Sequence, residues 1–226
     1  MVVCARTGSG KTLSYLVPVV ERLYHERWSP YDGLGALVIV PTRELAHQAF
    51  EVLRSFGGMH DFSAGVITGG RDLAFEQERI RGMNILICTP GRLLQHMNES
   101  EGLDTSGLKM LVIDEVDRIT LDMGFKETVD QIMRNLPSKT QTMLVSATVG
   151  KNLKDLARVN LKEGYEYICI HDFDSIESLA NEYGETEDKA ITEQLKSITP
   201  VKLLHFYMQV NIDEKLDTLF SFIKSH

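Results

Sequence analysis

The sequence contains few cysteines and no long apolar run. Its three cysteines, Cys4, Cys88 and Cys169, are far apart, and each falls within a short apolar stretch. An odd and scattered set is typical of buried thiols in a reducing intracellular compartment, and it argues against zinc ligands and disulfides. No stretch approaches the ~20 apolar residues that a membrane-spanning helix requires, so we expect no membrane segment.

An excess of basic residues is also lacking. The chain has 24 lysines and arginines against 32 aspartates and glutamates, which gives a net charge of −8. This balance excludes general binding of polyanions through net charge. Contact with a polyanion therefore has to come from a local patch of arginines and backbone N–H groups. With 226 residues, 43% of them hydrophobic, the chain can bury one substantial core and a small second piece.

The first distinctive stretch runs from Ala5 to Thr12 and reads ARTGSGKT, between an apolar run and a helix-like pattern. A glycine-rich turn in this place directs backbone N–H groups into one concavity, where the helix dipole and Lys11 add positive potential. Thr12 is placed to offer its hydroxyl to Mg²⁺, so the stretch predicts a nucleoside triphosphate site. The alternative is a plain turn that caps a helix. Because the chain reaches this turn so early, we expect no signal peptide.

Apolar runs alternate with helix-like segments through about residue 171. Unbroken apolar runs are typical of buried parallel strands, and their repetition predicts an α/β fold with a mostly parallel sheet and helices on both faces. Thr42 is a plausible N-cap for a helix that begins near Arg43. The predicted strands are Met1–Cys4, Ala36–Val40, Ala64–Ile67, Ile85–Cys88, Met110–Ile113, Thr142–Val145 and Tyr165–Ile170.

Polar motifs follow these runs, and ligands of such sheets bind beyond the carboxyl ends of the strands. One motif is the acid pair Asp114-Glu115. Asp114 can hold Mg²⁺ through water, while Glu115 can orient and deprotonate the water that attacks a γ-phosphate. Two ordinary surface acids are the alternative interpretation. Together with the glycine-rich stretch, the pair favours nucleotide hydrolysis over phosphoryl transfer to another substrate.

The last fifty residues follow another pattern. Residues 174–193 hold seven acidic residues against the single base Lys189, which is typical of a solvated linker. Residues 203–210 read as a strand, and Asp213 to Ile223 reads as an amphipathic helix. We therefore divide the chain into a first lobe (1–173), an acidic linker (174–200) and the start of a second lobe (201–226).

Six motifs follow one another along the chain: Ala5–Thr12, Pro41–Ala46, Gly69-Gly70, Thr89–Arg92, Asp114–Asp117 and Ser146–Thr148. These motifs and their order resemble the first RecA-like lobe of DEAD-box ATP-dependent RNA helicases, a P-loop NTPase fold. The resemblance covers about residues 1–171. With Phe62–Gly65 and Leu94–Met97, it is strongest with the nucleolar subgroup that acts in small ribosomal subunit (pre-rRNA) assembly.

The resemblance implies a role for each matching position. Lys11, Asp114 and Glu115 would be catalytic, and Thr12 and Asp114 would serve Mg²⁺. ATP would be bound by Arg6, Thr7, Gly8, Ser9, Gly10, Lys11 and Thr12. The nucleotide state would be coupled to lobe closure by Asp117, Ser146, Ala147 and Thr148, and the RNA backbone would be bound, independently of base sequence, by Thr42, Arg43, Gly70, Thr89 and Arg92.

Some features depart from the family pattern. Val116 stands where the family has alanine, which we expect to add bulk beside the acids. One additional residue separates Asp117 from Leu121, and we expect a bulge or a looser turn near Ile119-Thr120 to absorb it. The segment that recognises adenine and the second lobe with its arginine fingers are missing, so we expect slow ATP turnover by this chain alone.

Three functions remain open from the sequence. The leading one is the ATP-binding lobe of an RNA helicase in the nucleus and nucleolus. The second is a helicase-like scaffold that binds RNA or protein without catalysis, and the third is another nucleic-acid translocase. The apolar face of the tail could dock on the first lobe, stay disordered, or pair with a second copy as a homodimer.

Overall fold

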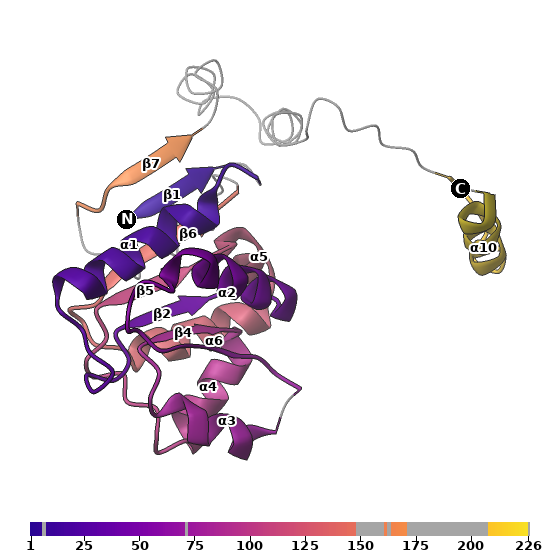
Figure 1. The fold of residues 1–226 in the computed structure, drawn as a ribbon. Helices are drawn as coiled ribbons and strands as arrows, with labels where there is room; N and C mark the ends of the chain where they lie inside the picture. The colour runs from indigo at the N-terminus through magenta and orange to yellow at the C-terminus, as the bar shows by residue number, and fades with distance from the viewer. Residues whose placement is uncertain (6–7, 71, 148–160, 162–163, 171–207, 226) are drawn as a thin grey trace. The chain divides into compact units, whose positions relative to one another are not determined.

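The computed structural model describes residues 1–5, 8–70, 72–147, 161, 164–170 and 208–225 (Figure 1). The chain divides into two compact units, Met1–Tyr183 and Gly184–His226. Among the described residues, no helix combines the length and the apolar character that crossing a membrane would need. The acidic segment 174–200 lies outside the described residues.

The first unit alternates strands and helices as the sequence predicts. All seven predicted strands are present, with ends that differ by at most two residues. The strands are β1 (Val2–Ala5), β2 (Ala36–Ile39), β3 (Ala64–Ile67), β4 (Ile85–Cys88), β5 (Met110–Ile113), β6 (Gln141–Ser146) and β7 (Tyr167–Ile170). The helices are α1 (Lys11–His25), α2 (Arg43–Gly57), α3 (Leu73–Ile80), α4 (Pro90–Glu99), α5 (Val116–Leu121) and α6 (Met123–Arg134).

The strands form one sheet in the order β3-β4-β2-β5-β6-β1-β7, and every pairing is parallel. Parallel neighbours require crossover connections, and helices supply those between successive strands from β1 to β6. Cys4 and Cys169, far apart in the sequence, are register partners on β1 and β7. Because all strands point the same way, their carboxyl ends meet at one edge of the sheet, where the site is found.

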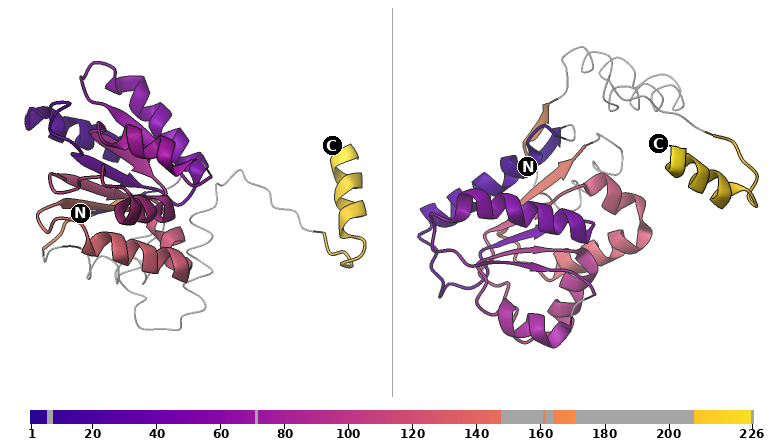
Figure 2. Two further views of the ribbon diagram at one scale, coloured as in Figure 1. Left: turned by 90° about the horizontal axis from the view of Figure 1, so that it is seen from below. Right: turned by 45° about the vertical axis from the view of Figure 1, so that its right-hand side comes forward.

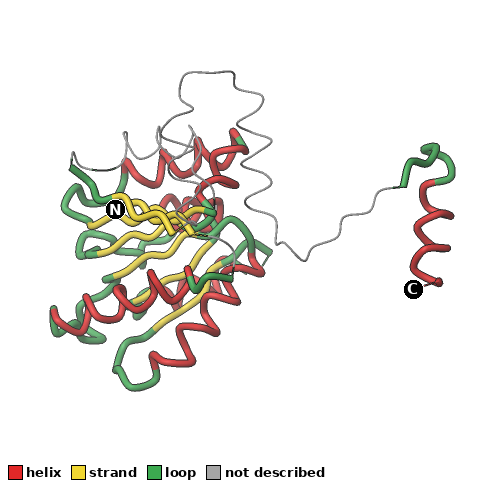
Figure 3. Tube along the Cα trace, turned by 90° about the horizontal axis from the view of Figure 1, so that it is seen from above, coloured by secondary structure: helices red, strands yellow, loops and turns green. Residues whose placement is uncertain are grey.

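Helices cover both faces of the sheet (Figures 2 and 3). Alternate strand residues point to opposite faces, so Val38 and Val112 pack with α1 and α2, while Ile39 and Ile113 pack with α4, α5 and α6. The residues of β1, β2, β4 and β5 are almost completely buried, whereas β7 at one edge of the sheet is largely exposed. This packing confirms the predicted α/β architecture and fixes the strand ends as a rigid base for the loops.

Local signals in the sequence define the helix ends. The Thr42 hydroxyl accepts a hydrogen bond from the Leu45 amide at 3.3 Å, as predicted for an N-cap. Of the bulge or looser turn expected near Ile119-Thr120, the bulge is not present, because α5 stays helical to Leu121. The chain breaks instead at Asp122, whose carboxylate accepts hydrogen bonds from the first amides of α6.

The second unit contributes one described helix, α10 (Lys215–Ser225), within two residues of the predicted ends. Its apolar side chains Leu216, Leu219, Phe220 and Ile223 are all at least half exposed. Most of the predicted strand over 203–210 lies outside the described residues, and the described residues 208–210 are not in a strand.

Candidate functional site

The sheet order brings the predicted nucleotide residues together. Strands β1, β6 and β5 are consecutive neighbours, so the glycine-rich turn after β1 and Asp114 after β5 lie on either side of Ser146 at the end of β6. Lys11 is close enough to Asp114 and Glu115 to favour the charged forms of both carboxyls. The predicted convergence of Lys11 with the acid pair is therefore present in the fold.

The glycine-rich turn has the backbone of a phosphate cradle. Gly8 and Gly10 have φ angles of 81° and 87°, a left-handed region that other L-residues adopt at a cost. A Cβ added at either glycine would meet no atom within 4 Å, so the turn faces open space. Helix α1 begins at Lys11 with no side-chain cap and no acidic residue in its first turn, which suits an anionic ligand. Arg6 and Thr7 lie outside the described residues.

Asp114 is a buried carboxylate, with 8% of its surface exposed. Its Oδ1 accepts a hydrogen bond from the Glu115 amide at 2.8 Å. Burial raises the pKa of the Asp114 carboxyl, while that hydrogen bond, Tyr15 and Lys11 act in the opposite direction. A buried acid whose charge is incompletely compensated is suited to a cation.

Glu115 is held in a strained conformation, with φ 51° and ψ 48°, which is uncommon outside glycine and is often found at functional sites. Its Oε2 is buried and has no hydrogen-bond partner among the described residues, although Arg118 Nε lies 3.1 Å away. Burial is the largest cause that raises the pKa of this carboxyl. A carboxylate with a raised pKa beside the proposed phosphate site is suited to act as a general base.

Tyr15 was not predicted as a site residue. It lies one helical turn after Lys11, is 1% exposed, and its hydroxyl interacts with the Asp114 carboxylate and the Thr12 hydroxyl. Burial, followed by Asp114, raises the pKa of the Tyr15 phenol. The sequence did carry a signal for it: Tyr15 occupies a core-facing position of a predicted helix, where its hydroxyl needs a buried hydrogen-bond partner.

The residues that would hold Mg²⁺ are few. In the described part of the chain, no group of three or more histidine, cysteine, aspartate and glutamate side chains could hold a metal ion. Mg²⁺ often keeps several waters and binds through one or two carboxylates together with substrate phosphates. Thr12 and Asp114 beside an open phosphate cradle fit that arrangement, which depends on a nucleotide.

The predicted coupling residues lie close to this site. Ser146 is fully buried at the end of β6, and Ala147 follows it. The charge of Asp117, in the first turn of α5, raises the pKa of both Asp114 and Glu115. Thr148 lies outside the described residues. The position of Asp117 beside the acids is compatible with the coupling role, which stays a prediction.

A second group of predicted residues lies at the ends of β2, β3 and β4. Thr42, Arg43, Thr89 and Arg92 line one groove together with Gly69, Gln95 and Phe125. The Arg43 guanidinium lies over Gly70, where an added Cβ would come within 2.5 Å of Arg43 Nη1. The fold therefore brings the predicted RNA-binding positions to one place.

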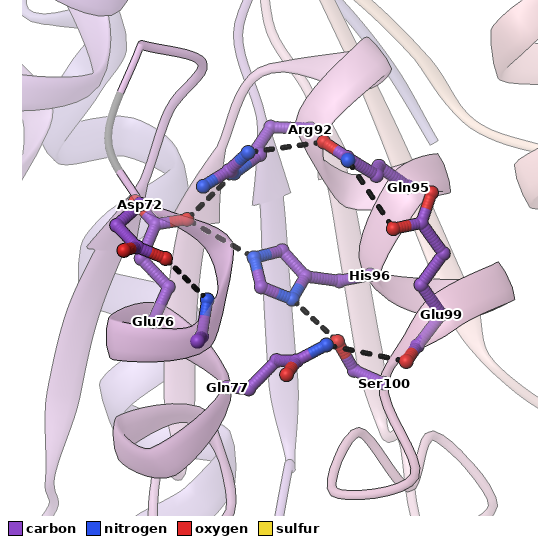
Figure 4. Close-up of polar contacts among 9 residues, drawn as sticks. Asp72, Glu76, Gln77, Arg92, Gln95, His96, Glu99 and Ser100 are labelled. Atoms are coloured by element: carbon purple, nitrogen blue, oxygen red, sulfur yellow. Dashed lines mark hydrogen bonds and ion pairs between the residues drawn. The ribbon is translucent and has the colours of Figure 1, made fainter.

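Arg92 is buried, with 8% of its surface exposed. Its Nε donates a hydrogen bond to Glu76 Oε2 at 2.7 Å, and its Nη1 donates to Gln95 at 3.0 Å (Figure 4). Glu76 was not among the residues predicted for this site. It shares one face of α3 with the buried Ile80, so an acid at a core-facing position was the available signal.

Comparison with known proteins assigns the family. The model for "DEAD/DEAH box helicase" matches residues 1–156. The chain belongs to the DEAD/DEAH box helicase family. It is 51% identical to the ATP-dependent RNA helicase DBP4 of Coccidioides immitis (strain RS) over 221 residues. This alignment covers 98% of this chain and 25% of the relative. The chain is 50% identical to the probable ATP-dependent RNA helicase DDX10 of Homo sapiens, over 98% of this chain and 23% of the relative.

Solved helicase structures agree with the fold. A crystal structure of a DEAD box protein from Methanococcus jannaschii matches with a TM-score of 0.68 and 26% identity, over 99% of this chain and 66% of that one. The chain spans about a quarter of the length of the two relatives named above. The similarity therefore describes one part of such a helicase.

Val116 does not add bulk beside the acids of this DEAD-box site, contrary to the expectation from the sequence. Its side chain is fully buried in the core with Ile119 and Ile132. The additional bulk relative to the family alanine therefore fills the interior under α5 and α6.

Proposed function

We propose that this chain is the ATP-binding lobe of an ATP-dependent RNA helicase. The observation that carries the proposal is the convergence of an open phosphate cradle, Lys11 and the pair Asp114-Glu115 at one sheet edge. Lys11 and the backbone of Gly8–Thr12 would hold the phosphates. Thr12 and Asp114 would hold Mg²⁺, which would neutralise phosphate charge, and Glu115 would take the proton of the attacking water.

RNA would lie along the neighbouring groove. Thr42, Arg43, Gly70, Thr89 and Arg92 present arginines, hydroxyls and backbone N–H groups, which recognise phosphates and read no base. Binding would be independent of sequence and would weaken with salt. Hydrolysis would remodel RNA when a second lobe closes on this one and supplies further cationic groups.

The wider biological role is proposed by analogy. The relatives are named as DBP4 and DDX10 RNA helicases, and the subgroup resemblance favours ribosome biogenesis in the nucleolus. Burial, followed by Cys169, raises the pKa of Cys4 to about 12, so this thiol would stay protonated and unreactive. We retain the lobe boundaries 1–173, 174–200 and 201–226, and a tail-mediated homodimer that the exposed side chains of α10 would allow.

A thermal melt with saturating Mg-ADP tests the nucleotide site. Ligand at about 100 times its dissociation constant stabilises the folded state by about 2.7 kcal/mol, so the melting temperature should rise by several degrees. Lys11→Ala should abolish the rise, while the exposed control Lys126→Ala should keep it. No rise in the unsubstituted chain would refute the proposed site.

Catalysis is tested in the protein that also carries the second lobe. RNA-stimulated phosphate release should fall by at least 100-fold in Glu115→Gln, because the water loses its base. Equal rates in the two forms would favour the scaffold. A larger stimulation by DNA than by RNA would favour a different translocase.

A further inference from the structure

A buried polar cluster joins α3 to α4 beside the proposed RNA groove (Figure 4). It consists of Glu76 from α3 with Arg92, His96 and Ser100 from α4 and its C-terminal end. The side chains of Glu76, Arg92 and His96 are only 5%, 7% and 0% exposed. Three ionisable side chains buried together are unusual in a helix pair and need a specific reason.

Glu76 is the centre of the cluster. Its Oε2 accepts from Arg92 Nε at 2.7 Å and lies 3.0 Å from His96 Nε2. Because a carboxylate only accepts, Nε2 carries the hydrogen, and His96 Nδ1 is left facing the Ser100 hydroxyl at 2.7 Å. One carboxylate oxygen thus fixes two side chains that are one helical turn apart on α4.

Stability alone does not account for this arrangement. Glu76 Oε1 is buried and has no hydrogen-bond partner among the described residues, which costs free energy. A buried ion pair is often no more stabilising than apolar residues of the same volume. Apolar side chains would join α3 to α4 equally well, so the charged groups are better explained by the geometry that they fix.

The cluster lies where it would shape the groove. Arg92 and Gln95 line the groove directly, and Thr89 and Gly91 precede Arg92 at the start of α4. Helix α3 follows Gly70, over which the Arg43 guanidinium lies. Glu76 therefore connects the two loops that carry the proposed phosphate contacts.

We propose that Glu76 is a positioning residue for the RNA groove, which it serves by fixing Arg92 and the first turn of α4. The inference rests on the proposed RNA-binding function. Glu76 would not touch RNA itself, since its carboxylate is buried. Its effect would be to present Arg92, Thr89 and Gly91 in one arrangement, which reduces the ordering that binding would otherwise require.

The proposal is tested by whether a charge-removing substitution strengthens or weakens RNA binding. Coulomb attraction alone predicts that Glu76→Gln strengthens binding of polyanionic RNA, because one negative charge is lost. Positioning predicts that it weakens binding by about tenfold, the scale of one charge-assisted hydrogen bond. Glu78→Gln is the matched control, since it makes the same charge change on the exposed side of α3.

The measurement is fluorescence anisotropy of a labelled polyuridine strand titrated with this chain. Weaker binding in Glu76→Gln with no weakening in Glu78→Gln supports the proposal, and equal or tighter binding in Glu76→Gln overturns it. On an Arg92→Ala background Glu76→Gln should add no further loss, because it acts through Arg92. If Glu76→Gln does not fold, Glu76→Asp replaces it, which keeps the charge and shortens the reach to Arg92 Nε; it should weaken binding severalfold, and unchanged binding overturns the proposal.

Hydrogen exchange without RNA separates this inference from the proposed function. Glu76→Gln should speed amide exchange in the first hydrogen-bonded turn of α4 (residues 93–96), which begins with the bond from the Leu93 amide to the Thr89 carbonyl, and Glu78→Gln should not. Unchanged exchange there overturns the positioning role. If the unsubstituted chain binds no RNA but keeps its Mg-ADP shift, the RNA part of the proposed function fails while exchange still decides whether Glu76 fixes α4.

Discussion

The two halves of the sheet edge differ in how their charged side chains are compensated by neighbouring groups. At the ends of β1, β6 and β5, the Asp114 carboxyl is buried and the Glu115 carboxyl is partly buried, and burial raises the pKa of each. At the ends of β3, β4 and β2, the Arg92 guanidinium is held by Glu76 and Gln95. In the first half, the carboxylates would be neutralised by Mg²⁺ when a nucleotide binds. In the second half, the Arg92 guanidinium is already fixed by its neighbours before RNA would bind.

This difference follows from the chemistry that each half is proposed to perform. Hydrolysis needs a base and a metal site whose properties change when ligands arrive. Recognition of a phosphate backbone needs donors in fixed positions and little change on binding. The parallel sheet serves both because it places all carboxyl ends on one rigid edge.

The largest expected effect is that of Asp114→Asn on the nucleotide half. Loss of a carboxylate that would hold Mg²⁺ through water should reduce the Mg²⁺-dependent affinity for ADP by about 10–100-fold. Isothermal titration with and without Mg²⁺ measures this. An unchanged Mg²⁺ dependence would contradict the role of Asp114.

The same variant should make the ligand-free chain more stable at neutral pH. Burial raises the pKa of the Asp114 carboxyl above its unfolded value, so this group favours folding below about pH 4. That contribution is lost as pH rises through the folded-state pKa. Asp114→Asn should therefore raise the melting temperature at pH 7 and leave it nearly unchanged at pH 4. A gain of equal size at both pH values would rule out the electrostatic cause.

Val116→Ala should separate packing from nucleotide chemistry. Removing a fully buried side chain that packs under α5 should lower the free energy of unfolding by about 2 kcal/mol. The temperature rise caused by Mg-ADP should persist, because the side chain points into the core. Urea unfolding and a thermal melt check the two parts. A lost nucleotide shift in a folded variant would place Val116 in the site after all.

Gly70→Ala tests the fixed geometry of the RNA half. The residue has φ +94°, and its new Cβ would lie 2.5 Å from Arg43 Nη1. We expect a loss of about 1 kcal/mol in stability from the backbone alone, together with weaker RNA binding as Arg43 moves. Gly69→Ala is the control, since its Cβ would lie 3.4 Å from Arg43 Nη2. Equal effects of the two substitutions would show that the position of Arg43 is not critical.

Tyr15→Phe should have the smallest effect. It removes a hydroxyl that interacts with Asp114 and Thr12 and retains the buried ring. We expect a loss of about threefold in Mg²⁺-dependent ADP affinity, the scale of a neutral hydrogen bond. Titration of ADP at several Mg²⁺ concentrations measures it, and an equal loss without Mg²⁺ would indicate a general packing defect.

Much of the molecule could be predicted from local patterns. Each β-strand is a short apolar run bounded by a polar motif, and the Thr42 cap follows from its hydroxyl before a helical pattern. The partners of Glu76 and Tyr15 could not be predicted, because each polar group is satisfied by a residue distant in the sequence. The prediction placed the Val116 side chain beside the acids and was wrong, because where this side chain points depends on how α5 packs against the core.

The sequence by itself determined the strands, the helices and the identity of the chemical groups after each strand. These properties depend on residues within one or two helical turns, where apolar periodicity and turn chemistry decide the backbone. Only the tertiary structure decided that β6 lies between β1 and β5, and that α3 supplies the carboxylate that holds Arg92. The order of strands and the partners of buried charges arise from long-range packing, which no local pattern encodes.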